Sequence, residues 1–192
     1  MLISVRDLAV ARGGRVLLRG IGFALDREQA LHIAGGNGSG KTSLLETLCG
    51  LRAPEQGTVL GLESSAAFHW IGHKNAQNPA LTAVENLRFW CQINGAGEDR
   101  IENAFDRLQL RAQQHRPSRE LSIGQRRRAA LARLLVARRP LWLLDEPLSG
   151  LDAGGVELFS ELLKAHLALG GAAVITSHQE LPAFAGMSRL QL

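Results

Sequence analysis

The segment Gly35–Thr42 contains residue types and a spacing that can bind phosphate, because it fits G-x-x-x-x-G-K-[ST] at every fixed position. Its glycines allow the backbone to curl until several N–H groups point at one phosphate, and a helix beginning near Lys41 adds the positive end of its dipole. The Lys41 ammonium can reach the β- and γ-phosphates of a nucleoside triphosphate, and the Thr42 hydroxyl can bind Mg²⁺. The predicted nucleotide-binding residues are Gly35, Gly36, Asn37, Gly38, Ser39, Gly40, Lys41, Thr42 and Ser43.

A second group of residues could act on the bound triphosphate. The apolar run Leu141–Leu144 leads directly into Asp145 and Glu146. A strand here would deliver Asp145 to the edge of a sheet, where its carboxylate can hold Mg²⁺, usually through water. Glu146 would then be placed to polarise a water for in-line attack on the γ-phosphate. By itself the pair could be a solvated acidic turn, but about a hundred residues after a phosphate loop it predicts hydrolysis of the nucleotide.

Short apolar segments alternate with helical segments along the parts of the chain that carry these residues. Strands are predicted at Ala30–Gly35, Leu141–Leu144 and Ala172–Thr176, and helices at Lys41–Cys49 and Ala153–Leu169. This alternation predicts an α/β fold with a mostly parallel sheet that helices cover on both faces.

The N-terminal part of the chain has the pattern of a hairpin. Leu2–Ala11 and Val16–Leu25 predict two strands joined by a turn at Gly13-Gly14. Short strands are also predicted at Thr58–Leu60 and Ala66–Ile71.

The middle of the chain is helical from Thr82 to about Ala137 and resembles an insertion into the α/β core. A capping box at Thr82-Ala83-Val84-Glu85 predicts the start of a first helix. A second helix is predicted over Asp99–Leu110, a loop over Arg111–Arg119, and a third helix from near Ile123 to Arg138.

Composition limits the class of protein. The length of 192 residues suits one domain with a substantial core, and a net charge of +4 is too small to argue for a nucleic-acid partner. Cys49 and Cys91 have no metal-ligand spacing and are expected to be reduced thiols. The N-terminus has the pattern of a strand instead of a signal peptide, and no apolar run approaches the ~18 residues needed to span a bilayer.

The segment Leu121–Gln125, sequence LSIGQ, precedes Asp145 by about twenty residues. With the two motifs above, it makes the chain resemble the nucleotide-binding subunits of ATP-binding cassette (ABC) transporters, whose signature is LSGGQ. The resemblance covers essentially the whole chain and implies a P-loop NTPase (RecA-like) core, an N-terminal antiparallel β subdomain and an inserted helical subdomain. The resemblance implies that residues 1–192 form a single domain. Its core and β subdomain would span about 1–74 and 139–192, and its helical insertion about 75–138.

In this family the signature opens a helix aimed at the γ-phosphate bound by the opposite subunit. The resemblance therefore implies a head-to-tail dimer with two sandwiched ATP molecules, in which Ser122 and Gly124 contact the nucleotide of the other copy. It also implies that Asp152, in Ser149–Asp152, belongs to the D-loop, and that His178 contacts the γ-phosphate and orients the water. The signature residues are Leu121, Ser122, Ile123, Gly124 and Gln125; the catalytic residues are Lys41, Glu146 and His178.

Three positions depart from the family pattern. Arg12 occupies about the place of the aromatic residue that stacks on adenine, and a guanidinium can still stack on a purine. Lys74 occupies the place of the Q-loop glutamine, for which Gln77 could substitute only if the loop shifts. Gly36 stands where many members have proline, and we expect no functional change there.

The stretches GHKNAQNPALTAVENLRFW and LSIGQRRRAALARLLVARRPLWLLDEPLSGLD particularly resemble the ATP-binding subunit of the cytochrome c biogenesis (haem exporter) system. That resemblance implies an integral membrane partner docked near Lys74–Asn86, on the cytoplasmic face of the bacterial inner membrane, and no nucleic-acid partner. Alternatives are another small bacterial exporter, a soluble nucleic-acid-associated ABC ATPase suggested by Arg126–Arg128, and a P-loop kinase.

Overall fold

A computed structural model describes residues 1–62, 64, 67–181 and 186–192 of the chain, which form two compact units. The first unit contains Met1–His73, Arg139–Pro147 and Leu162–Leu192, and the second contains Lys74–Arg138 and Leu148–Glu161. No helix in the described ranges is both long and apolar enough to cross a membrane.

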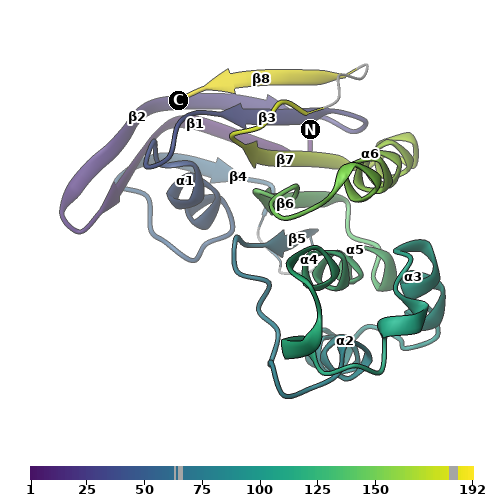
Figure 1. Cartoon of the computed structure of the whole chain (residues 1–192). Coiled ribbons are helices and arrows are strands. Elements are labelled where there is room, and N and C mark those ends of the chain that lie inside the picture. The colour runs from purple at the N-terminus through teal and green to yellow at the C-terminus, as the bar shows by residue number, and fades with distance from the viewer. Residues whose placement is uncertain (63, 65–66, 182–185) are drawn as a thin grey trace. The chain divides into compact units, whose positions relative to one another are not determined.

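A parallel sheet of five strands forms the centre of the first unit (Figure 1). The order of its strands is β5-β6-β7-β3-β8, and every neighbouring pair is parallel. The strands are β3 (Ala30–Ala34), β5 (Phe68–Ile71), β6 (Leu141–Asp145), β7 (Ala172–Ser177) and β8 (Met187–Gln191). All residues of β3, β6 and β7 are buried, as the continuous apolar runs in the sequence indicated.

The strand β8 was not predicted. Its residues are half-buried or exposed and include Ser188 and Arg189, so it has no apolar run to mark it. It forms because β3 offers it an edge, with Ala30 opposite Met187 and Ala34 opposite Gln191.

A smaller antiparallel sheet has the order β2-β1-β4. The predicted hairpin is present, with β1 over Ile3–Arg12 and β2 over Arg15–Leu25, and the third strand, β4, spans Gln56–Leu60. Gly13 and Gly14 have φ values of 58° and 77°, which a two-residue turn with both central residues left-handed requires.

The core of this unit joins the two sheets and the helix α1, Lys41–Leu48. Leu44 and Leu45 of α1 are fully buried in the same cluster as residues of β1, β3, β6 and β7. Fixing α1 in this way also fixes the loop that precedes it. The predicted helix near the C-terminus is α6, Ala153–Ala168, which extends from one unit into the other.

The second unit is helical, and its principal helices are α2 (Ala83–Asn94), α3 (Ile101–Arg107), α4 (Ile123–Leu131) and α5 (Arg133–Val136). The predicted capping box is present, because the Thr82 side chain accepts from Glu85 N while the Glu85 carboxylate accepts from Thr82 N.

Two predicted helix ends in this unit were wrong. The helix expected over Asp99–Leu110 ends at Arg107, since Gln109 has a φ of 55°. The third helix divides into α4 and α5 at Ala132 and ends at Val136, because Ala137 is extended. The expected loop 111–119 contains the 3₁₀ turns η2 (Arg111–Gln113) and η3, which spans Ser118–Glu120.

Candidate nucleotide site

The strand order brings the predicted phosphate-binding and catalytic residues of the first unit together. β6, β7 and β3 are consecutive neighbours, so Asp145 lies opposite Thr176, and Ser177 lies opposite Ala34. Because the strands are parallel, their carboxyl ends meet at one edge of the sheet, where ligands bind in open α/β folds. The phosphate loop, the Asp145-Glu146 pair and His178 all follow at this edge.

The loop between β3 and α1 has the features of a phosphate cradle. Gly38 and Gly40 have φ values of 82° and 100°, which allow the loop to curl. A Cβ on Gly35 would lie 2.6 Å from Ser39 Oγ, so only glycine leaves that space open. The Ser39 hydroxyl is buried without a hydrogen-bond partner, as expected for a group that would donate to a phosphate oxygen. Around Gly36 the space is open, so the structure explains no requirement for glycine there.

Lys41 directs its ammonium into this cradle. Its Nζ donates to the carbonyl oxygens of Gly35 at 2.7 Å and Gly36 at 3.1 Å, and it lies 3.5 Å from Glu146 Oε1. The side chain is 7 % exposed, so the charge acts where water screens it little. This arrangement fits the phosphates of a nucleotide.

Asp145 is held by two hydroxyl groups. It is fully buried, and its two oxygens accept from Thr42 Oγ1 at 2.9 Å and from Thr176 Oγ1 at 2.7 Å. Among the described residues no group of three or more His, Cys, Asp or Glu side chains could hold a metal. Mg²⁺ bound to nucleotides usually takes only one or two protein ligands besides phosphate oxygens and water, so the pair Thr42 and Asp145 fits this ion.

Thr176 is a site residue that the sequence analysis missed. It directly follows the apolar run Ala172–Ile175, and nothing in its spacing distinguishes it from a strand residue that packs in the core. The sequence shows only a hydroxyl residue at the end of an apolar run, and the structure adds that this residue is fully buried.

Glu146 has a left-handed backbone, with a φ of 50°. Its N–H donates to the Thr176 carbonyl at 3.1 Å and to Thr176 Oγ1 at 3.2 Å, which supports this unfavourable conformation. Its Oε2 accepts from His178 N at 3.2 Å and lies 2.9 Å from His178 Nδ1. The predicted base and the predicted switch histidine are therefore in direct contact.

A second histidine lies beneath the loop. His32 on β3 is buried, and its Nε2 lies 3.4 Å from the Ser177 carbonyl. Burial lowers the pKa of His32, partly offset by the Ser177 carbonyl, so the ring tends to be neutral.

The predicted signature lies in the second unit, at the start of α4. Ser122 caps this helix by accepting from Gln125 N at 3.1 Å, and the Gln125 side chain accepts from Ser122 N at 2.9 Å. Ile123 is 64 % exposed, whereas Leu121 is buried. Asp152 accepts from Gly155 N at 2.9 Å at the beginning of α6.

The residues predicted to form the Q-loop differ in their surroundings. Lys74 is exposed. The Gln77 amide nitrogen donates to the Arg126 carbonyl at 3.2 Å, while its oxygen is buried without a partner, so in this structure Gln77 is bonded within the second unit. Arg12 is exposed at the end of β1, next to the hairpin turn.

The arginine run 126–128 is engaged within the second unit. Arg127 is 2 % exposed and donates to Asn75 Oδ1 at 3.0 Å, and Arg128 donates to the Leu108 carbonyl at 3.2 Å. Arg126 donates to the Leu121 carbonyl, just before the signature helix. All three arginines therefore donate hydrogen bonds to groups of the second unit.

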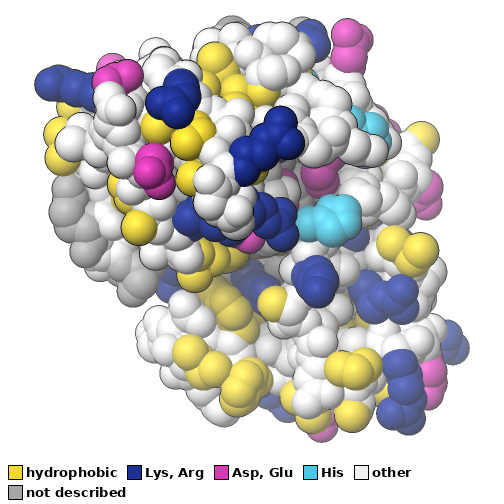
Figure 2. Space-filling view, turned by 90° about the vertical axis from the view of Figure 1, so that its left-hand side faces the viewer, with side chains coloured by type: hydrophobic (Ala, Val, Ile, Leu, Met, Phe, Trp, Pro, Cys, Tyr) yellow, Lys and Arg dark blue, Asp and Glu magenta, His cyan; other side chains and the backbone are white. Residues whose placement is uncertain are grey.

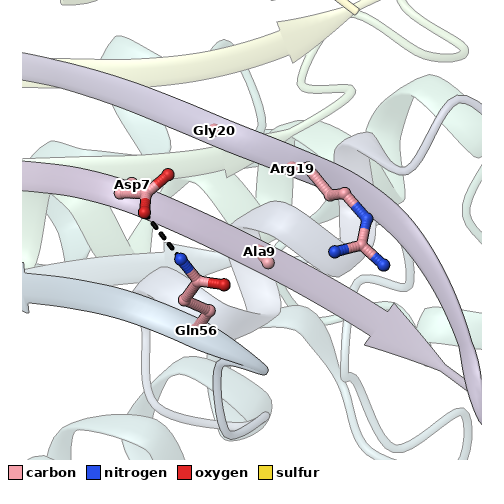
Figure 3. Close-up of a pocket in the computed structure, with 5 residues that line it drawn as sticks. All are labelled: Asp7, Ala9, Arg19, Gly20 and Gln56. Atoms are coloured by element: carbon pink, nitrogen blue, oxygen red, sulfur yellow. Dashed lines mark hydrogen bonds between the residues drawn. The ribbon is translucent and has the colours of Figure 1, made fainter.

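A separate open pocket of about 350 Å³ lies on the antiparallel sheet (Figure 3). Its lining includes Asp7, Arg19 and Gln56, and the Gln56 amide donates to Asp7 at 2.6 Å. Successive side chains of a strand point to opposite faces, so Arg19 and Leu18 lie on opposite faces of β2. Leu18 is buried and lies close to Gly40 of the phosphate loop, so the pocket beside Arg19 is on the other face of the sheet. No predicted site residue lines this pocket.

Comparison with known proteins gives a consistent result. A family model described as "ABC transporter" matches residues 18–149. The chain is similar to a "Cytochrome c biogenesis ATP-binding export protein CcmA" from Mesorhizobium japonicum, with 46 % identity over 94 % of both chains. It is also similar to the protein of that description from Paracoccus denitrificans, with 48 % identity over 94 % of this chain and 84 % of the relative.

Solved structures resemble the fold. A putative ABC transporter ATP-binding protein from Pyrococcus furiosus superposes with a TM-score of 0.85 at 22 % identity, covering 98 % of this chain and 96 % of that one. The "Structure of ATP binding subunit of ABC transporter" gives a TM-score of 0.83 at 23 % identity, covering 93 % and 80 %. The predicted fold class is confirmed.

Proposed function

The chain belongs to the ABC transporter family, and we propose that it is the ATP-binding subunit of an export complex that supports cytochrome c biogenesis. Its reaction is the hydrolysis of ATP to ADP and phosphate, coupled to a membrane partner. The relatives named for this process match nearly the whole chain, which supports the assignment.

In this proposal Gly35–Ser43 bind the phosphates of ATP, and Lys41 meets the negative charge of the β- and γ-phosphates. The orphaned Ser39 hydroxyl and the buried ammonium support this role. Thr42 and Asp145 would hold Mg²⁺, which neutralises phosphate charge when it is bound. Arg12, at the end of the hairpin, would lie against the base.

The observation that most directly supports catalysis is the position of the Glu146 carboxylate. One oxygen lies 3.5 Å from Lys41 Nζ, and the other lies 2.9 Å from His178 Nδ1. A carboxylate beside the cation that binds the γ-phosphate is suited to accept a proton from the attacking water. His178 would hold the carboxylate and orient that water.

The proposal includes a second copy of the chain. Ser122 and the 64 % exposed Ile123 begin α4 at the surface, so they are available to a nucleotide bound by another copy. Asp152 would take part in the same contact. A membrane subunit would dock near Lys74–Asn86, with this chain on the cytoplasmic face of the inner membrane.

Glu146→Gln tests catalysis and assembly together, with Glu102→Gln on the exposed surface of α3 as the matched control. We expect Glu146→Gln to bind ATP, to lose about 10²- to 10⁴-fold in phosphate release, and to run as a dimer with ATP, alone or with its membrane subunit. Hydrolysis at the wild-type rate would refute the assigned base. If Glu146→Gln failed to associate under every nucleotide condition, the proposed head-to-tail dimer would be refuted.

The biological role has its own test. In cells that lack the gene, wild-type protein and Glu102→Gln should restore covalent attachment of haem to c-type cytochromes, whereas Glu146→Gln should not. Normal cytochrome c in the deletion strain would refute the role in cytochrome c biogenesis and favour another exporter.

A further inference from the structure

We propose that Arg52 is a positioning residue, which sets the separation between the phosphate loop and the hairpin that contacts the base. This inference rests on the proposed function, in which α1 leads from the phosphates and Arg12 lies against the base. Arg52 touches neither ligand and acts through the elements that do.

Arg52 is attached firmly to the end of α1. Its backbone N–H donates to the Glu46 carbonyl at 3.1 Å, and its Nη2 donates to Glu46 Oε2 at 2.8 Å. Both side chains are less than one-third exposed, at 28 % for Arg52 and 29 % for Glu46. The guanidinium is therefore held in a defined position relative to the helix that begins at Lys41.

The same guanidinium reaches the hairpin. Its Nη1 donates to the Ala11 carbonyl at 3.3 Å, one residue before Arg12. The pairing of β1 with β4 extends only to Ala9 and Gln56, and the Ala9 carbonyl accepts from Glu55 N at 2.9 Å. Carbonyls two residues apart in a strand point the same way, so Ala11 presents its oxygen just beyond the start of β4. At Ala11, Arg52 therefore supplies the hydrogen-bond donor that a longer β4 would have supplied.

The two bonds require arginine. A guanidinium offers donors in a rigid fork that can engage two acceptors in different directions, whereas a lysine ammonium is a single point of charge. The third guanidinium nitrogen, Nε, is buried without a partner, which is unfavourable by itself. The fork is kept in place by its bonds to Glu46 and Ala11.

The consequence concerns ligands that contain both a base and phosphates. ATP must satisfy the phosphate loop and the hairpin simultaneously, while inorganic tripolyphosphate needs only the loop. Without Arg52, the tip of the hairpin loses its support on the β4 side and Arg12 is no longer held in register. Figure 2 shows the side of the molecule toward which this hairpin projects, with Lys and Arg side chains gathered on it.

The experiment measures the dissociation constants of ATP and inorganic tripolyphosphate by calorimetry. We expect Arg52→Met to weaken ATP binding about fivefold to tenfold, roughly the contribution of one ordinary hydrogen bond, and to change tripolyphosphate binding less than about twofold. Arg52→Lys should give a smaller loss for ATP only. The control Arg6→Met, an exposed arginine on the same strand β1, should leave both constants unchanged.

A cycle with Arg12→Ala tests whether Arg52 acts through the hairpin. In that background Arg52→Met should weaken ATP binding by less than about twofold further, because both changes remove the same contact. Equal losses for ATP and tripolyphosphate, or fully additive losses in the cycle, would overturn the inference. Wild-type protein that binds neither ligand would instead overturn the proposed nucleotide site.

Discussion

Replacing Thr176 with valine tests how the residues at the sheet edge are held. Thr176 and Asp145 are both fully buried, and the Thr176 hydroxyl donates to Asp145 Oδ1 at 2.7 Å. Valine has nearly the same shape as threonine but cannot donate. The substitution therefore removes one of the hydroxyl donors to a buried carboxylate while preserving the packing of β7.

The magnitude follows from these contacts. A hydrogen bond to a charged group contributes about 1.5–3 kcal/mol, and full burial places this one near the middle of that range or above. The Glu146 N–H loses one acceptor as well, but it keeps the Thr176 carbonyl at 3.1 Å. We therefore expect a loss of about 2 kcal/mol in the free energy of unfolding, or about 4–8 °C in Tm for a chain of this size.

The assay is denaturant and thermal unfolding without nucleotide, with Thr176→Ser as the control that keeps the hydroxyl. Thr176→Ser loses only a methyl group, about 1 kcal/mol. In an Asp145→Asn background, the cost of Thr176→Val should fall by roughly half, since the acceptor is then neutral. A Thr176→Val protein as stable as wild type, or a loss of stability that is unchanged in the Asp145→Asn background, would contradict a stabilising hydrogen bond from Thr176 to Asp145.

Three further predictions concern other parts of the chain. A Cβ on Gly124 would lie 2.8 Å from the Gly150 carbonyl oxygen. Gly124→Ala should therefore lower the free energy of unfolding by about 1–3 kcal/mol in a denaturant titration. An unaltered unfolding midpoint would contradict this close approach. Thr82→Ala should lower the free energy of unfolding by about 1 kcal/mol, because it removes the side chain that caps α2. Thr82→Ser keeps the hydroxyl and should lower it much less. Equal losses in Tm for the two variants would argue against capping. Burial lowers the pKa of His32 below its ordinary 6.5, so between the folded pKa and 6.5 the unfolded state binds more protons. Stability should therefore rise with pH through that window and fall on acidification below about 6.5, and His32→Gln should flatten this part of the Tm profile.

Much of the geometry of the candidate nucleotide site could be predicted because its residues follow one another closely. Lys41 and Thr42 are adjacent in a loop whose glycines set its shape, and Asp145 with Glu146 ends an apolar strand. Turn chemistry and capping are similarly local, so the Gly13-Gly14 hairpin and the Thr82–Glu85 box were predicted correctly.

The missed features depend on contacts between distant residues. Thr176 has a site role only because β7 lies beside β6, and β8 is a strand only because β3 offers it an edge. Gln77 bonds Arg126, which is 49 residues away in the sequence, and Arg52 bonds Ala11, which is 41 residues away. No local period encodes such pairings.

Residue types and spacing were enough to predict three local features: a glycine-rich loop before a helix, an acidic pair after a buried strand, and the start of a helix at the LSIGQ segment. The tertiary structure decided which of these groups meet, by placing β6, β7 and β3 side by side so that Asp145, Thr176 and the phosphate loop share one edge. The physical reason is that residue type and spacing set local conformation, whereas strand order is set by burial of apolar faces contributed by segments far apart in the chain.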